Sequence, residues 1–136
     1  MLDQLTIGTV AILVTIIGHA FGLLTLATLL KRMSDHATPH IVTLSCAIVG
    51  VVFIHTIEVW GWAGLFYSLG EFESFERALH FSAVTATTLG YGDIVLSEQW
   101  QVLSTFEAMG GLLLFGASTA FILAVMRRLF EHLETR

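Results

Sequence analysis

A long apolar run without a formal charge, from Leu5 to Leu30, constrains this chain more than any other feature of its 136 residues. About 20 such residues in a helix cross the hydrocarbon core of a bilayer, so the run predicts a membrane span. A cleaved signal peptide has a basic start and a shorter apolar core, whereas here Asp3 precedes the run and Lys31 and Arg32 follow it. We therefore expect the run to stay in the mature protein as a transmembrane helix.

Composition agrees with an integral membrane protein. Hydrophobic residues make up 55% of the chain and charged residues 12%, with a mean hydropathy of +0.81, whereas about a quarter of a soluble domain is charged. The net charge is −5 and only six residues are Lys or Arg, too few to neutralise the phosphates of a nucleic acid. We expect a lipid bilayer and not a nucleic acid as partner, and no enzyme.

Two further apolar segments are long enough to span. The first follows Pro39, which comes after Thr38 in the order typical of a helix start, and predicts an outer helix over 40–67. The second predicts an inner helix over 100–128. Between them, the run 75–87 follows a possible Ser74 cap. At 1.5 Å per residue it reaches about 20 Å, too short to cross, so we expect it to re-enter the membrane, shielded by protein.

Basic residues predict the orientation, because they are retained preferentially on the cytoplasmic side. With three spans and one re-entrant helix, one side carries nearly all of them: Lys31, Arg32, Arg127, Arg128 and Arg136. The opposite side has Arg77 alone and is acidic, with Glu71, Glu73, Glu76, Asp93 and Glu98. We expect a multi-pass protein of the cell membrane with an extracellular N-terminus, a cytoplasmic C-terminus and an outer surface that attracts cations.

The segment between the re-entrant helix and the last span carries the most specific motif. Residues 88–93 read Thr-Leu-Gly-Tyr-Gly-Asp. This resembles the selectivity filter of potassium channels, usually Thr-Val-Gly-Tyr-Gly followed by Asp, with Leu89 in place of the valine. The two glycines suit such a loop, because Gly90 and Gly92 can adopt positive φ and let consecutive carbonyl groups turn toward one axis.

The resemblance covers about residues 41–128 and implies an all-α membrane protein: three transmembrane helices, a re-entrant pore helix and a selectivity-filter loop in a homotetrameric pore. It implies that the filter is 88–92, where the carbonyls of Thr88, Leu89, Gly90 and Tyr91 and the Thr88 hydroxyl bind dehydrated K⁺, with Asp93 at the outer mouth. The chain then divides into an extra N-terminal helix and cytoplasmic link, 1–36, and a pore module, 37–136. We expect no cofactor besides the permeant K⁺.

The pore helix departs from the family pattern. Many members have paired tryptophans where this chain has His80 and Phe81, and Phe81 cannot donate a hydrogen bond to brace the filter. A weakly selective monovalent cation channel is therefore one alternative. A non-conducting regulatory subunit that assembles with another pore is a second.

Ionisable residues inside the expected spans need partners, because charge is costly in the membrane. His55 and Glu58 are three residues apart on one helix face, and Glu107 lies at a similar depth in the last span. Together with His80, these residues are candidates for supporting the filter or for sensing protons. Both interpretations stay open on the sequence.

Glycines in the last span have two possible roles. Gly110, Gly111 and Gly116 permit a gating bend or close helix packing, and the sequence does not distinguish them. The spacing of Gly18 and Gly22 likewise predicts a helix contact in the first span.

Overall fold

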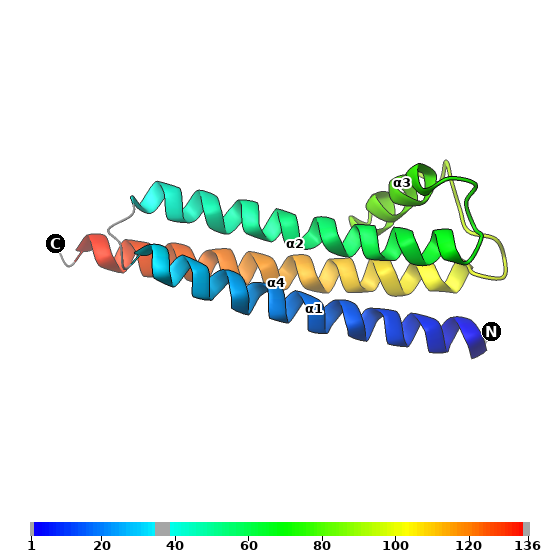
Figure 1. The fold of residues 1–136 in the computed structure, drawn as a ribbon, viewed down its shortest axis with the longest axis horizontal. Helices are drawn as coiled ribbons and strands as arrows, with labels where there is room; N and C mark the ends of the chain where they lie inside the picture. Colours follow the sequence, from blue (N-terminus) through cyan, green and yellow to red (C-terminus); the bar gives the residue numbers. More distant parts are fainter. Residues whose placement is uncertain (1, 35–38, 135–136) are drawn as a thin grey trace.

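The computed structural model describes residues 2–34 and 39–134, and of residues 34 and 132–134 the backbone only. These parts of the chain form four helices and contain no strand (Figure 1): α1 (Leu2–Ser34), α2 (His40–Ser68), α3 (Phe75–Ala86) and α4 (Gln101–Glu134). The expected all-helical fold is confirmed. Thr38 and Arg136, used above for a helix start and for orientation, lie outside the described residues.

Three of the helices, α1, α2 and α4, are long and apolar enough to cross a membrane. Within the most apolar stretch of each, only 17% of the residues are buried inside the chain. An apolar surface of this extent is stable when lipid or other protein covers it. The chain is therefore a multi-pass membrane protein whose spans still have free faces.

The helix boundaries differ from the expected ones mainly at the basic ends. α1 continues through Ser34, so Lys31 and Arg32 belong to the helix and not to a polar link. α4 likewise continues past Arg128 to Glu134. Helical hydrogen bonds do not stop where the hydrocarbon stops, and Lys, Arg, Leu and Met all favour helix in water. α1 also begins three residues before the apolar run, at Leu2. The ends of α2 and α3 and the start of α4 agree with the expected ones within one residue, which is the usual uncertainty of a helix end.

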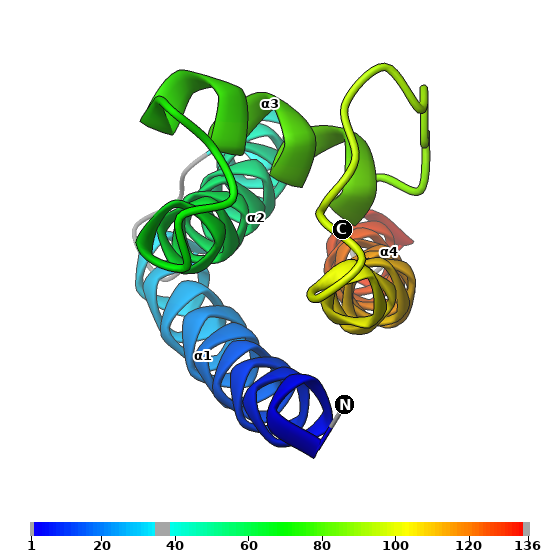
Figure 2. The same ribbon diagram turned by 90° about the vertical axis from the view of Figure 1, so that its right-hand side faces the viewer.

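The helices are arranged so that α3 sits at one end of the bundle. α1, α2 and α4 run alongside one another, and α3 is tilted across the end where α2 finishes and α4 begins (Figure 1). Viewed along the bundle, α3 and the loop after it bridge α2 and α4, while α1 lies on the other side of α2 (Figure 2). α3 contacts both α2 and α4, and α1 contacts the same two helices.

The densest part of the core holds α3 in place. Phe66 is fully buried and meets the ring of Phe81 edge-on, with centroids 5.2 Å apart. Phe72, from the turn before α3, lies 5.3 Å from the same ring. Leu103 of α4 is also fully buried in this cluster. Aromatic pairs of this geometry add to ordinary burial, so the position of α3 relative to α2 and α4 is well determined.

Polar contacts attach α1 to the other spans. Trp62 Nε1 donates to Thr15 Oγ1 at 3.1 Å. Gln4 Oε1 accepts a hydrogen bond of 3.1 Å from the backbone amide of Val102, one of the first-turn amides of α4 that have no partner within their own helix. The first helix is thus fastened to both α2 and α4.

Candidate functional site

The site begins with α3, a helix of 12 residues that ends inside the bundle. The Ser74 hydroxyl caps its start by accepting from the amide of Arg77 at 3.4 Å, and Glu76 lies in the first turn, where a negative charge is favourable. Twelve residues of helix reach about 18 Å, less than the hydrocarbon thickness. α3 therefore cannot span, and its C-terminal end points toward the loop that follows.

Backbone amides fasten that loop to the end of α3. The amides of Leu89 and Gly90 both donate to the carbonyl oxygen of Val84, at 3.0 and 3.3 Å, and the amide of Thr88 donates to Thr85 at 2.9 Å. Such bonds satisfy carbonyls that the helix end leaves free. The amides of residues 88–90 are therefore directed at the end of α3.

The sign of φ alternates along this loop. Thr88, Gly90 and Gly92 have φ of +57°, +55° and +74°, whereas Leu89 and Tyr91 do not have positive φ. Alternating left- and right-handed residues collect successive amides on one side of the chain and leave the carbonyls on the other. The sequence predicted positive φ for the glycines. It had no signal for Thr88, the one non-glycine residue with positive φ in the described part of the chain.

In the single chain, the outer side chains of the loop are exposed. Leu89 is 55% exposed and Tyr91 66%. Behind the loop lies a cavity of about 400 Å³ between α3 and α4, and its lining includes Phe81, Val84, Thr88, Gly90, Asp93 and Thr105. The loop therefore stands away from the body of its own chain, attached through the end of α3.

His80 and Asp93 are brought together across this loop. His80 Nε2 donates to Asp93 Oδ2 at 3.1 Å, and both side chains are about half exposed. The hydrogen bond from His80 lowers the pKa of Asp93 below its ordinary value of 3.8. Because the folded-state pKa is lowered, the contact stabilises the fold above pH 3.8, and this contribution is lost as the pH falls through the lowered pKa. Asp93 thus keeps a negative charge beside the loop.

We predict that His80→Ala raises the pKa of Asp93 toward its ordinary value, because the main stabiliser of the ionised carboxylate is removed. The carbon-13 shift of the Asp93 carboxyl, followed during an acid titration in detergent, measures this. His40→Ala, at the other end of α2, should leave the titration unchanged. An Asp93 pKa that stays the same in His80→Ala would contradict the role assigned to His80.

Glu107 supports α3 from behind. It is 1% exposed, and its Oε1 lies 2.5 Å from the hydroxyl oxygen of the fully buried Ser82. The same hydroxyl lies 2.8 Å from the carbonyl oxygen of Val59. One serine of α3 therefore connects α2 and α4. The sequence pointed to Glu107 but not to Ser82, because a serine within a helix carries no signal of a buried role.

We predict that Ser82→Ala destabilises the protein by about 1–3 kcal/mol, the usual effect of leaving a buried polar group without its partner. Ser68→Ala is the matched control, since its hydroxyl is exposed and donates to the carbonyl oxygen of Leu65 in its own helix. Denaturant unfolding in detergent measures both. If Ser82→Ala and Ser68→Ala are equally stable, the hydrogen bonds of Ser82 do not contribute to the free energy of unfolding.

His55 and Glu58 belong to a separate polar group. Their side chains are bonded at 2.9 Å, and the other partners are His19 of α1 and Ser118 of α4. Glu107 lines the same small cavity as His55 and Glu58, but its hydrogen bond goes to Ser82. His55, Glu58 and Glu107 are thus neighbours. His55 and Glu58 are hydrogen-bonded to each other, whereas Glu107 is hydrogen-bonded to Ser82. His19 and Ser118 were missed, because residues so far apart in sequence share no pattern.

The glycines of α4 have different surroundings along one continuous helix. A Cβ on Gly111 would lie 2.9 Å from the carbonyl carbon of Ala86 and closer still to its oxygen, at the end of α3. A Cβ on Gly110 would lie 3.3 Å from Ile12, and one on Gly116 would meet no atom within 4 Å. Close packing therefore explains Gly111. A gating hinge at Gly110, Gly111 or Gly116 stays a prediction.

The two glycines of α1 that the sequence singled out, Gly18 and Gly22, also differ from each other. A Cβ on Gly22 would lie 3.1 Å from Ile54 of α2, whereas one on Gly18 would meet nothing within 4 Å. Of this pair, Gly22 alone makes a close contact with the described part of the chain.

Comparison with known proteins adds one finding. A family model described as ion channel matches residues 41–128, more than half of the chain. The match includes α2 almost entirely, α3, the loop 88–93 and most of α4, and it leaves out α1. No curated protein and no solved structure matches the chain.

Proposed function

We propose that this chain, which belongs to the ion channel family, is a potassium-selective subunit that conducts K⁺ passively through a homotetrameric pore. One observation carries the proposal. The loop 88–92 has alternating φ and is tied by its amides to the C-terminal end of a short re-entrant helix. Carbonyl oxygens left free on the opposite side suit a dehydrated K⁺ ion, because they replace its hydration water without introducing a fixed charge, as in potassium channels.

Each residue of the loop has a role in this proposal. The carbonyls of Thr88, Leu89, Gly90 and Tyr91 bind K⁺, and Gly92 provides the last turn with positive φ. The Thr88 hydroxyl adds an oxygen at the inner end. The C-terminal end of α3 carries about half a negative charge from its backbone dipoles. Directed at the loop from four subunits, these helix ends favour a cation on the axis.

Four chains are required because one chain contributes one side of such a ring. The exposure of Leu89 and Tyr91 supports assembly, as does the small share of the spans that is buried within the chain. Large apolar side chains beside the ion path need covering by protein, since lipid does not enter there. In the tetramer, we propose, neighbouring subunits cover them.

The charges at the two ends support a proposed orientation. Lys31 and Arg32, at the end of α1, and Arg127 and Arg128 of α4 lie at one end of the bundle, and α3 lies at the other (Figure 1). Asp93 is at the α3 end. By the positive-inside rule, the basic end is cytoplasmic. The N-terminus and the loop then face the exterior.

A weakly selective cation channel is the second candidate, and it also rests on an observation. Phe81 is buried against the rings of Phe66 and Phe72 and has no hydrogen-bonding group to offer the hydroxyl of Tyr91. A filter that lacks such bracing holds its oxygens less rigidly. Its preference for K⁺ over Na⁺ is then smaller.

Flux from the purified chain in liposomes tests the proposal. We expect K⁺ flux that external barium blocks, with little Na⁺ flux, and a cross-linked assembly of four chains. Flux of both ions would favour the weakly selective channel. Absence of flux at every pH tested, from chains that are nevertheless assembled, would overturn the proposal in favour of a regulatory subunit.

A further inference from the structure

Two histidines, a glutamate and a serine form a closed ring of hydrogen bonds between three spans. Glu58 Oε1 lies 2.7 Å from His19 Nδ1, and Glu58 Oε2 lies 2.9 Å from His55 Nδ1. On the far side of both rings, Ser118 Oγ lies 2.9 Å from His55 Nε2 and 3.2 Å from His19 Nε2. His19 is 2% exposed, and the side chains of His55 and Glu58 are 12% and 13% exposed. We call these four residues the histidine cluster.

The ring has four close contacts but only three protons to place in them when both histidines are neutral and Glu58 is ionised. A neutral imidazole has one N–H, and a carboxylate only accepts. If both histidines donate through Nδ1 to Glu58, both Nε2 atoms are acceptors. The single proton of Ser118 can satisfy only one of them. With neutral histidines and an ionised Glu58, one of the four close contacts therefore joins two lone pairs.

A metal ion beside Glu58 removes this conflict. Each histidine then has an unprotonated Nδ1 as a ligand and carries its proton on Nε2. Both Nε2–H groups donate to Ser118 Oγ, which has two lone pairs. Histidine ligands are commonly held by a hydrogen bond from their other ring nitrogen to an acceptor, and here one serine provides it for both.

We propose that the histidine cluster is a binding site for one divalent transition-metal ion of the zinc class, with His19, His55 and Glu58 as ligands. One ligand atom from each of the three residues lies within 4.8 Å of the other two. Two histidines and one carboxylate are a ligand set that binds Zn²⁺ with one coordination position left open. Ligand bonds of about 2 Å hold the ligand atoms of a tetrahedral site about 3.3 Å apart. The two Nδ1 atoms, at 2.7 and 2.9 Å from the Glu58 oxygens, must therefore move slightly away from them to admit the ion. The site is distinct from the proposed K⁺ sites and does not depend on them.

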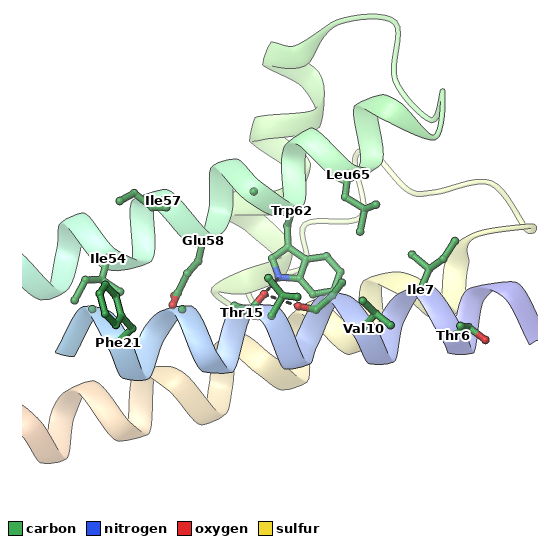
Figure 3. Close-up of a pocket in the computed structure, with 15 residues that line it drawn as sticks. Thr6, Ile7, Val10, Thr15, Phe21, Ile54, Ile57, Glu58, Trp62 and Leu65 are labelled. Carbon is green, nitrogen blue, oxygen red and sulfur yellow. Dashed lines mark hydrogen bonds between the residues drawn. The ribbon is translucent and has the colours of Figure 1, made fainter. Parts of the chain in front are cut away.

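The position of the cluster gives the metal a structural consequence. Glu58 extends from α2 toward α1 at the floor of an apolar groove between these two helices (Figure 3). His19 lies on α1, which is outside the family match, and Ser118 lies on α4. A bound ion therefore joins the additional helix to α2 directly and to α4 through Ser118. Glu107 is a further ionisable group near the cluster, in the small cavity that His55 and Glu58 also line.

Cobalt binding to the full-length protein tests this inference. Purified protein is stripped with a chelator in detergent and titrated with Co²⁺, whose visible absorption reports its ligands. We expect one Co²⁺ per chain with the intense absorption of a four-coordinate site, and displacement by Zn²⁺. Ser118→Ala, which retains all three ligands, should weaken binding about 10–100-fold. No flux measurement is involved, so the outcome is independent of potassium selectivity.

Substitutions at the ligands separate this site from adventitious binding at other histidines. His19→Ala should abolish the absorption, whereas His80→Ala, which removes an exposed histidine outside the cluster, should leave it intact. If His19→Ala does not fold, His19→Cys offers a thiolate ligand and should add a sulfur-to-cobalt band in the near ultraviolet. Absence of a Co²⁺ spectrum in the wild type, or its persistence in His19→Ala, would overturn the proposed metal site.

Discussion

Gly90→Ala should abolish K⁺ flux while the protein still assembles. Gly90 has φ of +55°, a conformation that costs a residue with a Cβ roughly 1–2 kcal/mol. In a ring of four subunits the total is roughly 4–8 kcal/mol, and every 1.4 kcal/mol changes a population about tenfold. Conducting rings should therefore become at least about 100-fold rarer. Liposome flux and size-exclusion chromatography of the same preparation measure the two effects.

Gly70→Ala is the matched control for this experiment. Gly70 also has a positive φ, +77°, and a Cβ there would meet no atom within 4 Å. It lies in the turn between α2 and α3, away from the loop 88–92. The strain per chain is similar, but flux should persist. Normal selective flux in Gly90→Ala would refute the assignment of the filter.

The second large effect is expected from Gly111→Ala, which should prevent stable folding or assembly. The added Cβ would overlap the carbonyl group of Ala86. This is backbone at the end of α3, so it cannot give way without moving the loop that the helix end holds. Overpacking a well-packed site typically costs about 1–3 kcal/mol, and a clash with backbone belongs at the upper end or beyond. Thermal unfolding and size-exclusion chromatography in detergent measure the loss.

Gly116→Ala is the control on the same helix. A Cβ there has no atom within 4 Å, and alanine favours helix over glycine by about 1 kcal/mol. Its stability should therefore equal or exceed that of the wild type. If Gly111→Ala and Gly116→Ala unfold at the same temperature, the close contact between Gly111 and Ala86 does not contribute to stability. A changed flux in Gly116→Ala at unchanged stability would instead support a gating hinge at that position.

Much of the architecture was predictable, because the bilayer restricts what an apolar chain can form. Backbone groups in hydrocarbon must bond within the chain, and a helix needs about 20 residues to cross. The length of each apolar run therefore distinguishes a span from a re-entrant helix. α3 starts at Phe75 and ends at Ala86, as expected within one residue. The family also follows from local sequence, since residues 88–93 form a contiguous motif.

The candidate site was only partly predictable. His55, Glu58 and Glu107 were recognisable as polar residues in apolar runs, yet Glu107 turns to Ser82 and the other two join His19. Thr88 takes a left-handed conformation that threonine rarely adopts by itself. It does so in a loop whose amides are bonded to the end of α3.

Length, hydropathy and contiguous motifs are local properties, so the three spans, the short helix between the last two and the filter-like motif could be recognised from the amino-acid sequence. Which polar residues meet depended on the tertiary structure. Spans that are apolar on nearly every face do not specify which side turns toward a neighbour. The rotation of each span about its own axis depends on how its side chains pack against the neighbouring helices, and on close approaches such as that of Gly111 to Ala86. The histidine cluster combines residues of three helices, so it can be recognised only in the tertiary structure.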